Sequence, residues 1–282
     1  MKKNIILLSA KRTGSTAVMK IFQKHNKVKL MHIDQKISNW ESNFWLLALD
    51  AINGKKDSFE VRLKNVAPFI KLQEKYDKKK IFEIYNEINN FFGPITFDKS
   101  PQYLGNINCL KLIQEYNSVH NNIVFLGLIR NPLDSIVSQY QLWREYKEND
   151  SLQEREKRWL KKYNHLAEIK KEIKNLKIIR YEDLVKNPKK VTTEIFNYCD
   201  IEYDENCINH LKEKSIGRYQ TFALIDENMK WKWSEEFNEH LIEYNYHPEN
   251  LKKISFLKKL QIIISSFKRY IPLKLKNFLR NK

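Results

Sequence analysis

The sequence predicts an α/β fold of three layers, in which a central parallel sheet is flanked by helices. Short apolar runs at 4–8, 28–31, 122–129 and 176–180 alternate with amphipathic helical segments. The run at 122–129 is continuously apolar and bounded by polar residues, which is typical of a strand buried on both faces. Repeated strand-then-helix order favours parallel pairing. The length of 282 residues suits one large domain, which we place at 1–250.

A small polar loop joins the first apolar run to the first helical segment. It reads SAKRTGST over residues 9–16, with Lys11 and Arg12 as cations and Gly14 where a backbone can approach a ligand closely. The first N–H groups of the following helix lack intrahelical partners and carry partial positive charge. This arrangement predicts an oxyanion site in a P-loop-like fold. The alternative is an ordinary polar turn before a surface helix.

This loop departs from the P-loop of nucleotide triphosphatases. That motif reads GxxxxGK[ST], with its lysine directly after the second glycine. Here Ser9 stands at the first glycine position, Ser15 stands at the lysine position, and Lys11 lies inside the loop. The sequence therefore argues against magnesium-dependent ATP hydrolysis. A P-loop-type nucleotide-dependent kinase is kept as an alternative function.

The chain is strongly basic, with 51 Lys and Arg against 34 Asp and Glu and a net charge of +17. Such a charge favours an anionic partner: a nucleotide-like donor, an acidic polysaccharide, nucleic acid or a membrane surface. A solubilising basic face and a non-catalytic anion-binding or nucleic-acid-binding module are the alternatives. The segment 251–282 alternates apolar and basic residues. This pattern is typical of an amphipathic helical tail that docks on a membrane, or of a helix that packs on the domain.

The cysteines and the N-terminus favour a cytoplasmic protein. Cys109, Cys199 and Cys207 are odd in number and lack metal-binding spacing, which fits a reducing compartment without structural disulfides or zinc. The apolar run that follows the first two lysines is too short for a signal peptide or a membrane span. We expect no metal, and a cytoplasmic location with the basic tail available to touch the inner membrane face.

Charged side chains follow two further predicted strands. His32 and Asp34 come after the second short strand, and Asp98 and Lys99 end a strand that precedes Pro101. Ligand-contacting groups of open α/β sheets gather at the carboxyl ends of the strands. These residues are therefore candidates for the same site as the loop. A surface histidine and a weak ion pair at a strand end are the alternatives.

The buried run at 122–129 leads into a second strand-to-helix junction. Arg130 follows the strand, Pro132 starts the helix, and Ser138 lies two turns further on. Arginine offers two parallel N–H groups to a phosphate. The junction therefore predicts a second phosphate-binding pair, formed by Arg130 and Ser138.

Three motifs, taken in order, resemble those of the PAPS-dependent sulfotransferase family. They are SAKRTGST at 9–16, RNPLDSIVSQY at 130–140 and RYEDLVKNP at 180–188, and the likeness extends over roughly residues 4–245. In style they are most similar to bacterial and heparan-type carbohydrate sulfotransferases. The resemblance implies transfer of a sulfuryl group from PAPS (3'-phosphoadenosine 5'-phosphosulfate) to a hydroxyl, or alternatively an amine, without a metal.

The resemblance also implies which residues bind the donor. The loop that holds the 5'-phosphosulfate falls on Lys11, Arg12, Thr13, Gly14, Ser15 and Thr16. The 3'-phosphate site falls on Arg130 and Ser138. Gly217 and Arg218 match more loosely a late basic loop that closes over the 3'-phosphate and adenine.

Two lysines have catalytic roles by the same resemblance. Lys11 would neutralise the leaving 5'-phosphate. The segment DKSPQYL at 98–104 is similar to one in heparan-type enzymes, which places Lys99 near the transferred group. The histidine base of small-molecule enzymes is replaced here by the sequence Ser-Pro-Gln at 100–102.

The catalytic base therefore stays open. We prefer His32 over Asp98, because a near-neutral pKa suits proton abstraction from a hydroxyl. Asp34 and Glu41 are the other candidates, by likeness to the glutamate of heparan-type enzymes. Aromatic and lysine residues between 143 and 163 suit a glycan or glycolipid acceptor, although aromatic residues at helical spacing more often belong to a core. We expect no nucleic-acid partner.

Overall fold

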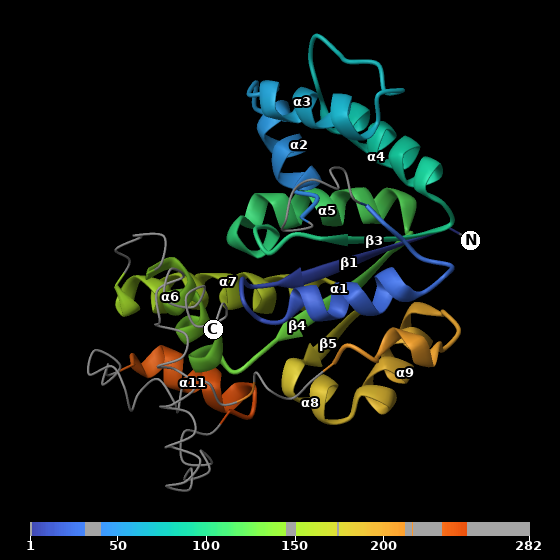
Figure 1. Cartoon of the computed structure of the whole chain (residues 1–282). Coiled ribbons are helices and arrows are strands. Elements are labelled where there is room, and N and C mark those ends of the chain that lie inside the picture. The colour runs from blue at the N-terminus through green and yellow to red at the C-terminus, as the bar shows by residue number, and fades with distance from the viewer. Residues whose placement is uncertain are drawn as a thin grey trace, which may run out of the picture.

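The computed structural model describes residues 2–31, 41–144, 151–173, 175–211, 216 and 233–246. Within them lies a five-stranded sheet of order β2-β3-β1-β4-β5, in which every neighbouring pair is parallel (Figure 1). The strands are β1 (Lys3–Ser9), β2 (Lys29–Leu30), β3 (Ile95–Lys99), β4 (Ile123–Ile129) and β5 (Leu176–Arg180). The predicted α/β class with a central parallel sheet is confirmed.

Helices connect the strands and cover both faces of the sheet (Figure 1). They are α1 (Ser15–Lys24), α2 (Phe44–Ile52), α3 (Asp57–Val66), α4 (Lys78–Phe92), α5 (Ile107–His120), α6 (Pro132–Arg144), α7 (Leu152–Glu172), α8 (Tyr181–Lys186), α9 (Pro188–Cys199) and α11 (Glu235–Glu243). Two short 3-10 helices, η1 (Tyr103–Gly105) and η2 (Glu205–Cys207), complete the described elements.

The central strand β1 divides the core into two layers. Ile5 and Leu7 pack into a cluster with residues of α1, α8 and α9, whereas Ile6 and Leu8 pack with residues of α2, α4, α5 and α7. All four side chains are fully buried. Successive residues of a strand point to opposite faces, so an uninterrupted apolar strand is the sequence of a strand covered on both sides.

Local signals set the starts of the helices on one of these faces. The side chain of Asp77 accepts a hydrogen bond from the backbone N–H of Lys80 and caps α4. The side chain of Asn106 caps α5 in the same way. Ser151 and Glu154 form a reciprocal capping box at the start of α7. These caps satisfy N–H groups that the helices themselves leave unpaired.

The structure refines the predicted elements. The helical pattern over 53–90 is divided into α3 and α4, with a non-helical segment at 67–77. Pro68 explains the break, because proline removes a helical donor and restricts the residue before it. The second strand is only two residues long, Lys29–Leu30. The helical pattern over 143–174 contains the end of α6 and the whole of α7.

Parallel pairing brings the ends of four strands to one edge of the sheet. Lys99 of β3 is in register with Leu7 of β1, and Ser9 of β1 is in register with Leu128 of β4. Arg180 of β5 pairs in register with Ile129. The loops after these strands therefore meet, as the sequence predicts for an open α/β sheet. None of the described helices is both long and apolar enough to cross a bilayer.

Candidate functional site

The loop between β1 and α1 turns sharply through two residues of positive φ. Arg12 has φ 67° and Gly14 has φ 98°. The hydroxyl of Thr13 donates to the carbonyl of Ala10 at 2.8 Å and closes the turn. Gly14 is the N-cap of α1 and places no side chain over the start of the helix. The N-terminus of α1, which carries a partial positive charge, therefore has no side-chain cap.

Tyr181 supports this loop from the end of β5. A Cβ atom built on Gly14 would lie 2.3 Å from Cδ2 of Tyr181, so a larger residue cannot fit there without a shift. The guanidinium carbon of Arg130 lies 4.9 Å from the centre of the same ring, within the range of a cation–π contact. One aromatic ring thus fixes both the oxyanion loop and the arginine that follows β4.

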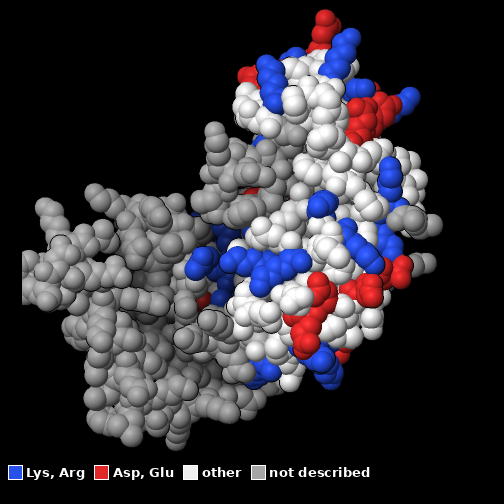
Figure 2. All heavy atoms as spheres, turned by 45° about the vertical axis from the view of Figure 1, so that its right-hand side comes forward, with Lys and Arg blue, Asp and Glu red and all other residues white. Residues whose placement is uncertain are grey.

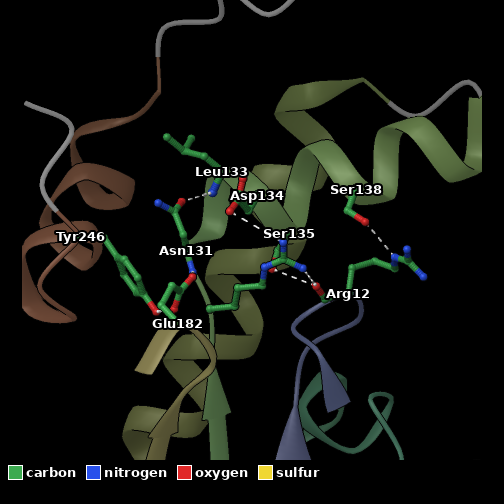
Figure 3. Close-up of polar contacts among 9 residues, drawn as sticks. Arg12, Asn131, Leu133, Asp134, Ser135, Ser138, Glu182 and Tyr246 are labelled. Carbon is green, nitrogen blue, oxygen red and sulfur yellow. Dashed lines mark hydrogen bonds and ion pairs between the residues drawn. The ribbon is translucent and has the colours of Figure 1, made fainter. Parts of the chain in front are cut away.

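Two arginines and a serine contact one another around the loop, and Figure 3 labels two of them, Arg12 and Ser138. Nη1 of Arg130 donates to the backbone carbonyl of Arg12 at 3.0 Å. Nε of Arg12 donates to the hydroxyl of Ser138 at 3.0 Å. Nη2 of Arg130 lies 3.7 Å from Oδ2 of Asp134, one turn into α6. Two guanidinium groups and a hydroxyl are groups that bind a phosphate.

A side chain of helix α6 also binds the backbone of the loop. Nε2 of Gln139 donates to the carbonyl of Lys11 at 3.1 Å. Together with the bond from Arg130 to Arg12, this contact fixes two successive carbonyls of the loop. Because Gln139 of α6 and Arg130 just before this helix engage these carbonyls, the peptide planes of the loop have a defined orientation.

Glu182 joins the start of α6 to the segment after α11 (Figure 3). One carboxylate oxygen accepts the backbone N–H of Asn131 at 2.9 Å, and the other accepts the hydroxyl of Tyr246 at 2.7 Å. The side-chain oxygen of Asn131 accepts the N–H of Leu133 at 3.0 Å. Burial and the charge of Glu182 raise the pKa of Tyr246 above its ordinary value. This buried network fixes the residue that follows Arg130.

Asp98 lies buried at the end of β3. Its carboxylate accepts hydrogen bonds from the hydroxyls of Ser42 and Tyr103, the latter at 3.1 Å. Burial raises the pKa of Asp98 to about 6, although the hydrogen bonds from Ser42 and Tyr103 act in the opposite direction. The backbone N–H of Ser42 donates to the carbonyl of Lys99 at 3.3 Å. Asp98 therefore attaches the segment before α2 to the end of β3.

This attachment brings Glu41 close to Lys99. The Lys99 side chain is 4 % exposed, and burial lowers its pKa, while the charges of Glu41 and Asp98 oppose that shift. Glu41 is only partly buried. The end of β3 thus presents a desolvated cation near a partly buried carboxylate, whose charge helps Lys99 to stay protonated.

The structure brings together most of the residues predicted for the site. Those around the oxyanion loop and the second junction are Lys11, Arg12, Thr13, Gly14, Ser15, Thr16, Arg130 and Ser138, and those at the end of β3 are Asp98 and Lys99. His32, Asp34, Gly217 and Arg218 lie outside the described residues, as does the tail 251–282.

Some residues of this site were missed from the sequence. Tyr181 and Glu182 stand directly after β5, and that strand-end position was a signal that could have found them. Ser42 and Tyr246 contact the site from distant parts of the chain, and no local pattern indicates them. Within the described part of the chain, no group of three or more His, Cys, Asp or Glu side chains could hold a metal ion.

The parallel α/β fold thus combines a helix N-terminus without a side-chain cap after β1 with a buried arginine after β4, and both features suit phosphate-like anions. A sequence model described as "Sulfotransferase family" matches residues 4–205. The chain therefore belongs to the sulfotransferase family, and the resemblance drawn from its motifs is confirmed. A search of curated protein sequences finds no match.

Solved sulfotransferase structures share the fold. The sulfotransferase domain from the curacin biosynthetic pathway aligns with a TM-score of 0.63 at 16 % identity, over 88 % of this chain and 99 % of that one. The sulfotransferase domain of the Synechococcus PCC 7002 olefin synthase gives 0.53 at 17 %, over 96 % and 98 %. Sulfotransferase STF9 from Mycobacterium avium gives 0.51 at 12 %, over 86 % and 76 %.

Proposed function

We propose that this protein transfers the sulfuryl group of PAPS to a hydroxyl of a glycan or glycolipid and releases adenosine 3',5'-bisphosphate. The observation that carries the proposal is the convergence of Arg12, Arg130 and Ser138 beside the open N-terminus of α1. Such a site can take two phosphate-like groups: one on the helix N-terminus and one on the guanidinium pair. PAPS carries its two anionic groups on the 5' and 3' sides of one ribose.

The residues present fit each part of this donor. The loop residues 11–16 supply backbone N–H groups, hydroxyls and the Lys11 cation for the 5'-phosphosulfate. Arg130 and Ser138, now joined by Arg12, suit the 3'-phosphate. We also propose that Gly217 and Arg218 cover the 3'-phosphate and adenine, and this part of the proposal is supported by the motif resemblance alone.

The transfer needs charge neutralisation on both sides of the sulfur. The acceptor oxygen forms a bond to sulfur while the bond between sulfur and the 5'-phosphate oxygen breaks. Lys11 stabilises the negative charge that grows on the departing phosphate, and Lys99 binds oxygens of the transferred group. The burial that lowers the pKa of Lys99 also strengthens its interaction with an anion, because fewer water molecules screen it.

The acceptor proton requires a base near Lys99. Asp98 has a pKa of about 6, but both of its oxygens are engaged by hydroxyls and it is 1 % exposed. We therefore give Asp98 a positioning role. Among the described candidates Glu41 is the better base, because it is accessible and lies near Lys99. His32 and Asp34 compete with it on sequence grounds.

The choice of an anionic acceptor rests on the positive charge of the protein surface. Lys and Arg side chains gather across the middle of one face of the molecule (Figure 2). This supports an anionic acceptor such as an acidic glycan or glycolipid headgroup. Contact of the basic tail 251–282 with the inner membrane face is part of the same proposal and rests on the sequence of that tail.

The proposal is tested by transfer of radiolabelled sulfate from PAPS to a panel of neutral sugars, uronate glycans, glycolipids and phenols. We expect labelled product with glycans or glycolipids, and its loss in Lys11→Ala and Lys99→Ala. Lys2→Ala, at the opposite end of β1, is the control and should keep full activity. Sulfate transfer that survives the loss of Lys11 would contradict the proposed role of the loop in binding PAPS. If only phenols were labelled, the acceptor would be a phenol and not a glycan or glycolipid.

A second measurement assigns the base. We expect Glu41→Gln to lower kcat by about 100-fold or more, since general-base catalysis contributes on that scale. His32→Ala and Asp34→Asn are the comparisons. If His32→Ala causes the larger fall and Glu41→Gln leaves kcat within twofold of the wild-type value, the base is His32.

A further inference from the structure

Two exposed phenylalanine side chains contact each other on the surface of the molecule. Phe69 follows α3 and is 47 % exposed, and Phe91 lies in the last turn of α4 and is 65 % exposed. Their ring centres are 4.7 Å apart. Phe92, which is partly buried, contacts Phe91 with ring centres 5.6 Å apart. Single exposed apolar side chains are ordinary, whereas rings gathered on one surface indicate an interaction site, and we call these three residues the phenylalanine patch.

Lysines from two other segments lie beside the phenylalanine patch. The ammonium group of Lys2 donates to the side-chain oxygen of Asn90, the residue before Phe91. A Cβ atom built on Gly93 would lie 3.7 Å from Cγ of Lys29, the first residue of β2. Both lysines are exposed. The surface therefore combines apolar rings with cations.

The patch lies at the amino ends of the strands, whereas the candidate site lies at their carboxyl ends. The N–H of Lys3, at the start of β1, donates to the carbonyl of Pro94, which precedes β3, at 2.9 Å. Figure 1 shows the end of α4 beside the start of β1, while the loop that leads to α1 leaves the other end of the strand. A partner bound to the patch consequently does not cover the loop after β1.

We propose that the phenylalanine patch docks the protein on the surface of a bilayer that contains anionic phospholipids. Aromatic side chains enter the boundary between headgroups and acyl chains, and lysines beside them attract the anionic headgroups. Both contributions act at the same surface of this protein. The inference does not depend on the proposed sulfate transfer.

The charges favour a bilayer over a second copy of this chain. A two-fold contact through the patch would bring the lysines of both copies together, and like charges at an interface are unfavourable. Lys71, two residues after Phe69, is also exposed, whereas Glu87 is the carboxylate closest to Phe91 along α4. The three lysines named here outnumber this carboxylate, and anionic headgroups would neutralise them.

The experiment measures the depth of residue 91 in the bilayer. Full-length Phe91→Cys is labelled with an environment-sensitive dye, and labelling is selective because Cys109, Cys199 and Cys207 are buried. Labelled Ile242→Cys is the matched control, since Ile242 is 60 % exposed on α11. Both proteins are mixed with vesicles of phosphatidylcholine, with or without phosphatidylglycerol, that carry spin-labelled lipids as quenchers.

We expect the dye at position 91 to shift its emission to the blue and to be quenched in vesicles that contain phosphatidylglycerol. The dye at position 242 should stay in water. Because the dye reports on one position, this measurement separates docking by the patch from binding by the tail 251–282.

The vesicle affinity of the unlabelled protein should depend on both kinds of side chain. Phe69→Ser combined with Phe91→Ser should weaken binding to anionic vesicles about tenfold or more, because two rings no longer enter the bilayer. Lys2→Gln combined with Lys29→Gln should weaken it by about the same factor, and this effect alone should disappear at high salt. Val61→Ser, at a residue 59 % exposed on α3, is the control and should bind as the wild type does.

Three results would overturn the proposal. A dye at position 91 that stays in water while the protein is bound to vesicles would assign the contact to another surface. Wild-type vesicle affinity in the variant that combines Phe69→Ser and Phe91→Ser would remove the rings from the contact. A wild-type dimer in sedimentation velocity that this variant abolishes would make the patch an interface between two copies. Sulfate transfer to a soluble glycan is a separate measurement, so these results leave the proposed function untouched.

Discussion

Nη1 of Arg130 donates a hydrogen bond to the backbone carbonyl of Arg12 at 3.0 Å, although 118 positions separate the two residues in the chain. The contact joins the end of β4 to the backbone of the loop after β1. Arg130 is also near Asp134 and Tyr181, so three interactions in all depend on the shape of one side chain.

Replacement of Arg130 by lysine should weaken donor binding. Lysine keeps the positive charge but loses the planar fork that reaches Arg12 and Asp134 together. We expect the Kd for adenosine 3',5'-bisphosphate to rise about tenfold to 100-fold, measured by calorimetry. Arg62→Lys, on the remote helix α3, is the matched control and should leave the Kd unchanged. Equal Kd values for wild type and Arg130→Lys would remove Arg130 from the site.

Gly14→Ala should destabilise the protein more than Gly54→Ala. Both glycines have positive φ, 98° and 85°, so both substitutions strain the backbone by about 1 kcal/mol. Only Gly14 faces a ring, with Tyr181 at 2.3 Å from the added methyl position, whereas Gly54 has open space. We expect denaturant unfolding to show an extra loss of about 1–3 kcal/mol for Gly14→Ala. Similar losses at both sites would show that Tyr181 does not fix the loop.

Asp98 should make the stability depend on pH between about 4 and 6. Its pKa is raised in the folded protein from 3.8 to about 6, so the folded state binds the proton more tightly than the unfolded state. The contribution of Asp98 to the free energy of unfolding is therefore greatest below pH 4 and is lost as the pH rises through 6, by about 3 kcal/mol over the whole range. Urea unfolding of wild type and Asp98→Asn across this range measures the difference. A constant difference between the two proteins would contradict the raised pKa.

Glu182 and Tyr246 should be energetically coupled. The carboxylate of Glu182 accepts from Tyr246 at 2.7 Å in a buried position, and removal of a hydrogen bond to a charged group costs about 1.5–3 kcal/mol. A double-mutant cycle of Glu182→Gln and Tyr246→Phe should give a coupling energy of about 1 kcal/mol or more. As a control, Asn245→Ala replaces Tyr246→Phe in the cycle, and its effect should add to that of Glu182→Gln. Additive effects would show that the two side chains do not interact in solution.

The fold could be predicted, and the proposed donor-binding residues could be placed at one sheet edge, because their signals are local. The loop at 9–16 and Arg130 each follow an apolar strand directly, and parallel pairing then brings both to one sheet edge. Ser42 and Tyr246 could not be found in this way. They reach Asp98 and Glu182 across 56 and 64 positions of sequence, so their roles depend on tertiary packing.

The base was the weakest of the sequence predictions for a related reason. The sequence presents His32, Asp34, Glu41 and Asp98 as chemically suitable groups at strand ends. Packing distinguishes the two described carboxylates: the hydroxyls of Ser42 and Tyr103 engage both oxygens of Asp98, and the same attachment brings Glu41 towards Lys99. Burial and hydrogen-bond partners, which decide whether a carboxylate is available, are not written in a local pattern.

The contribution of the 3'-phosphate to nucleotide affinity tests the central claim most directly. Calorimetry should compare adenosine 3',5'-bisphosphate with AMP, which lacks only that phosphate, in wild type and in Arg130→Lys. We predict that the bisphosphate binds wild-type protein about 100-fold more tightly than AMP, that Arg130→Lys loses most of this preference, and that ATP with magnesium gives no comparable binding. Equal affinities for the bisphosphate and AMP in wild-type protein would contradict the account.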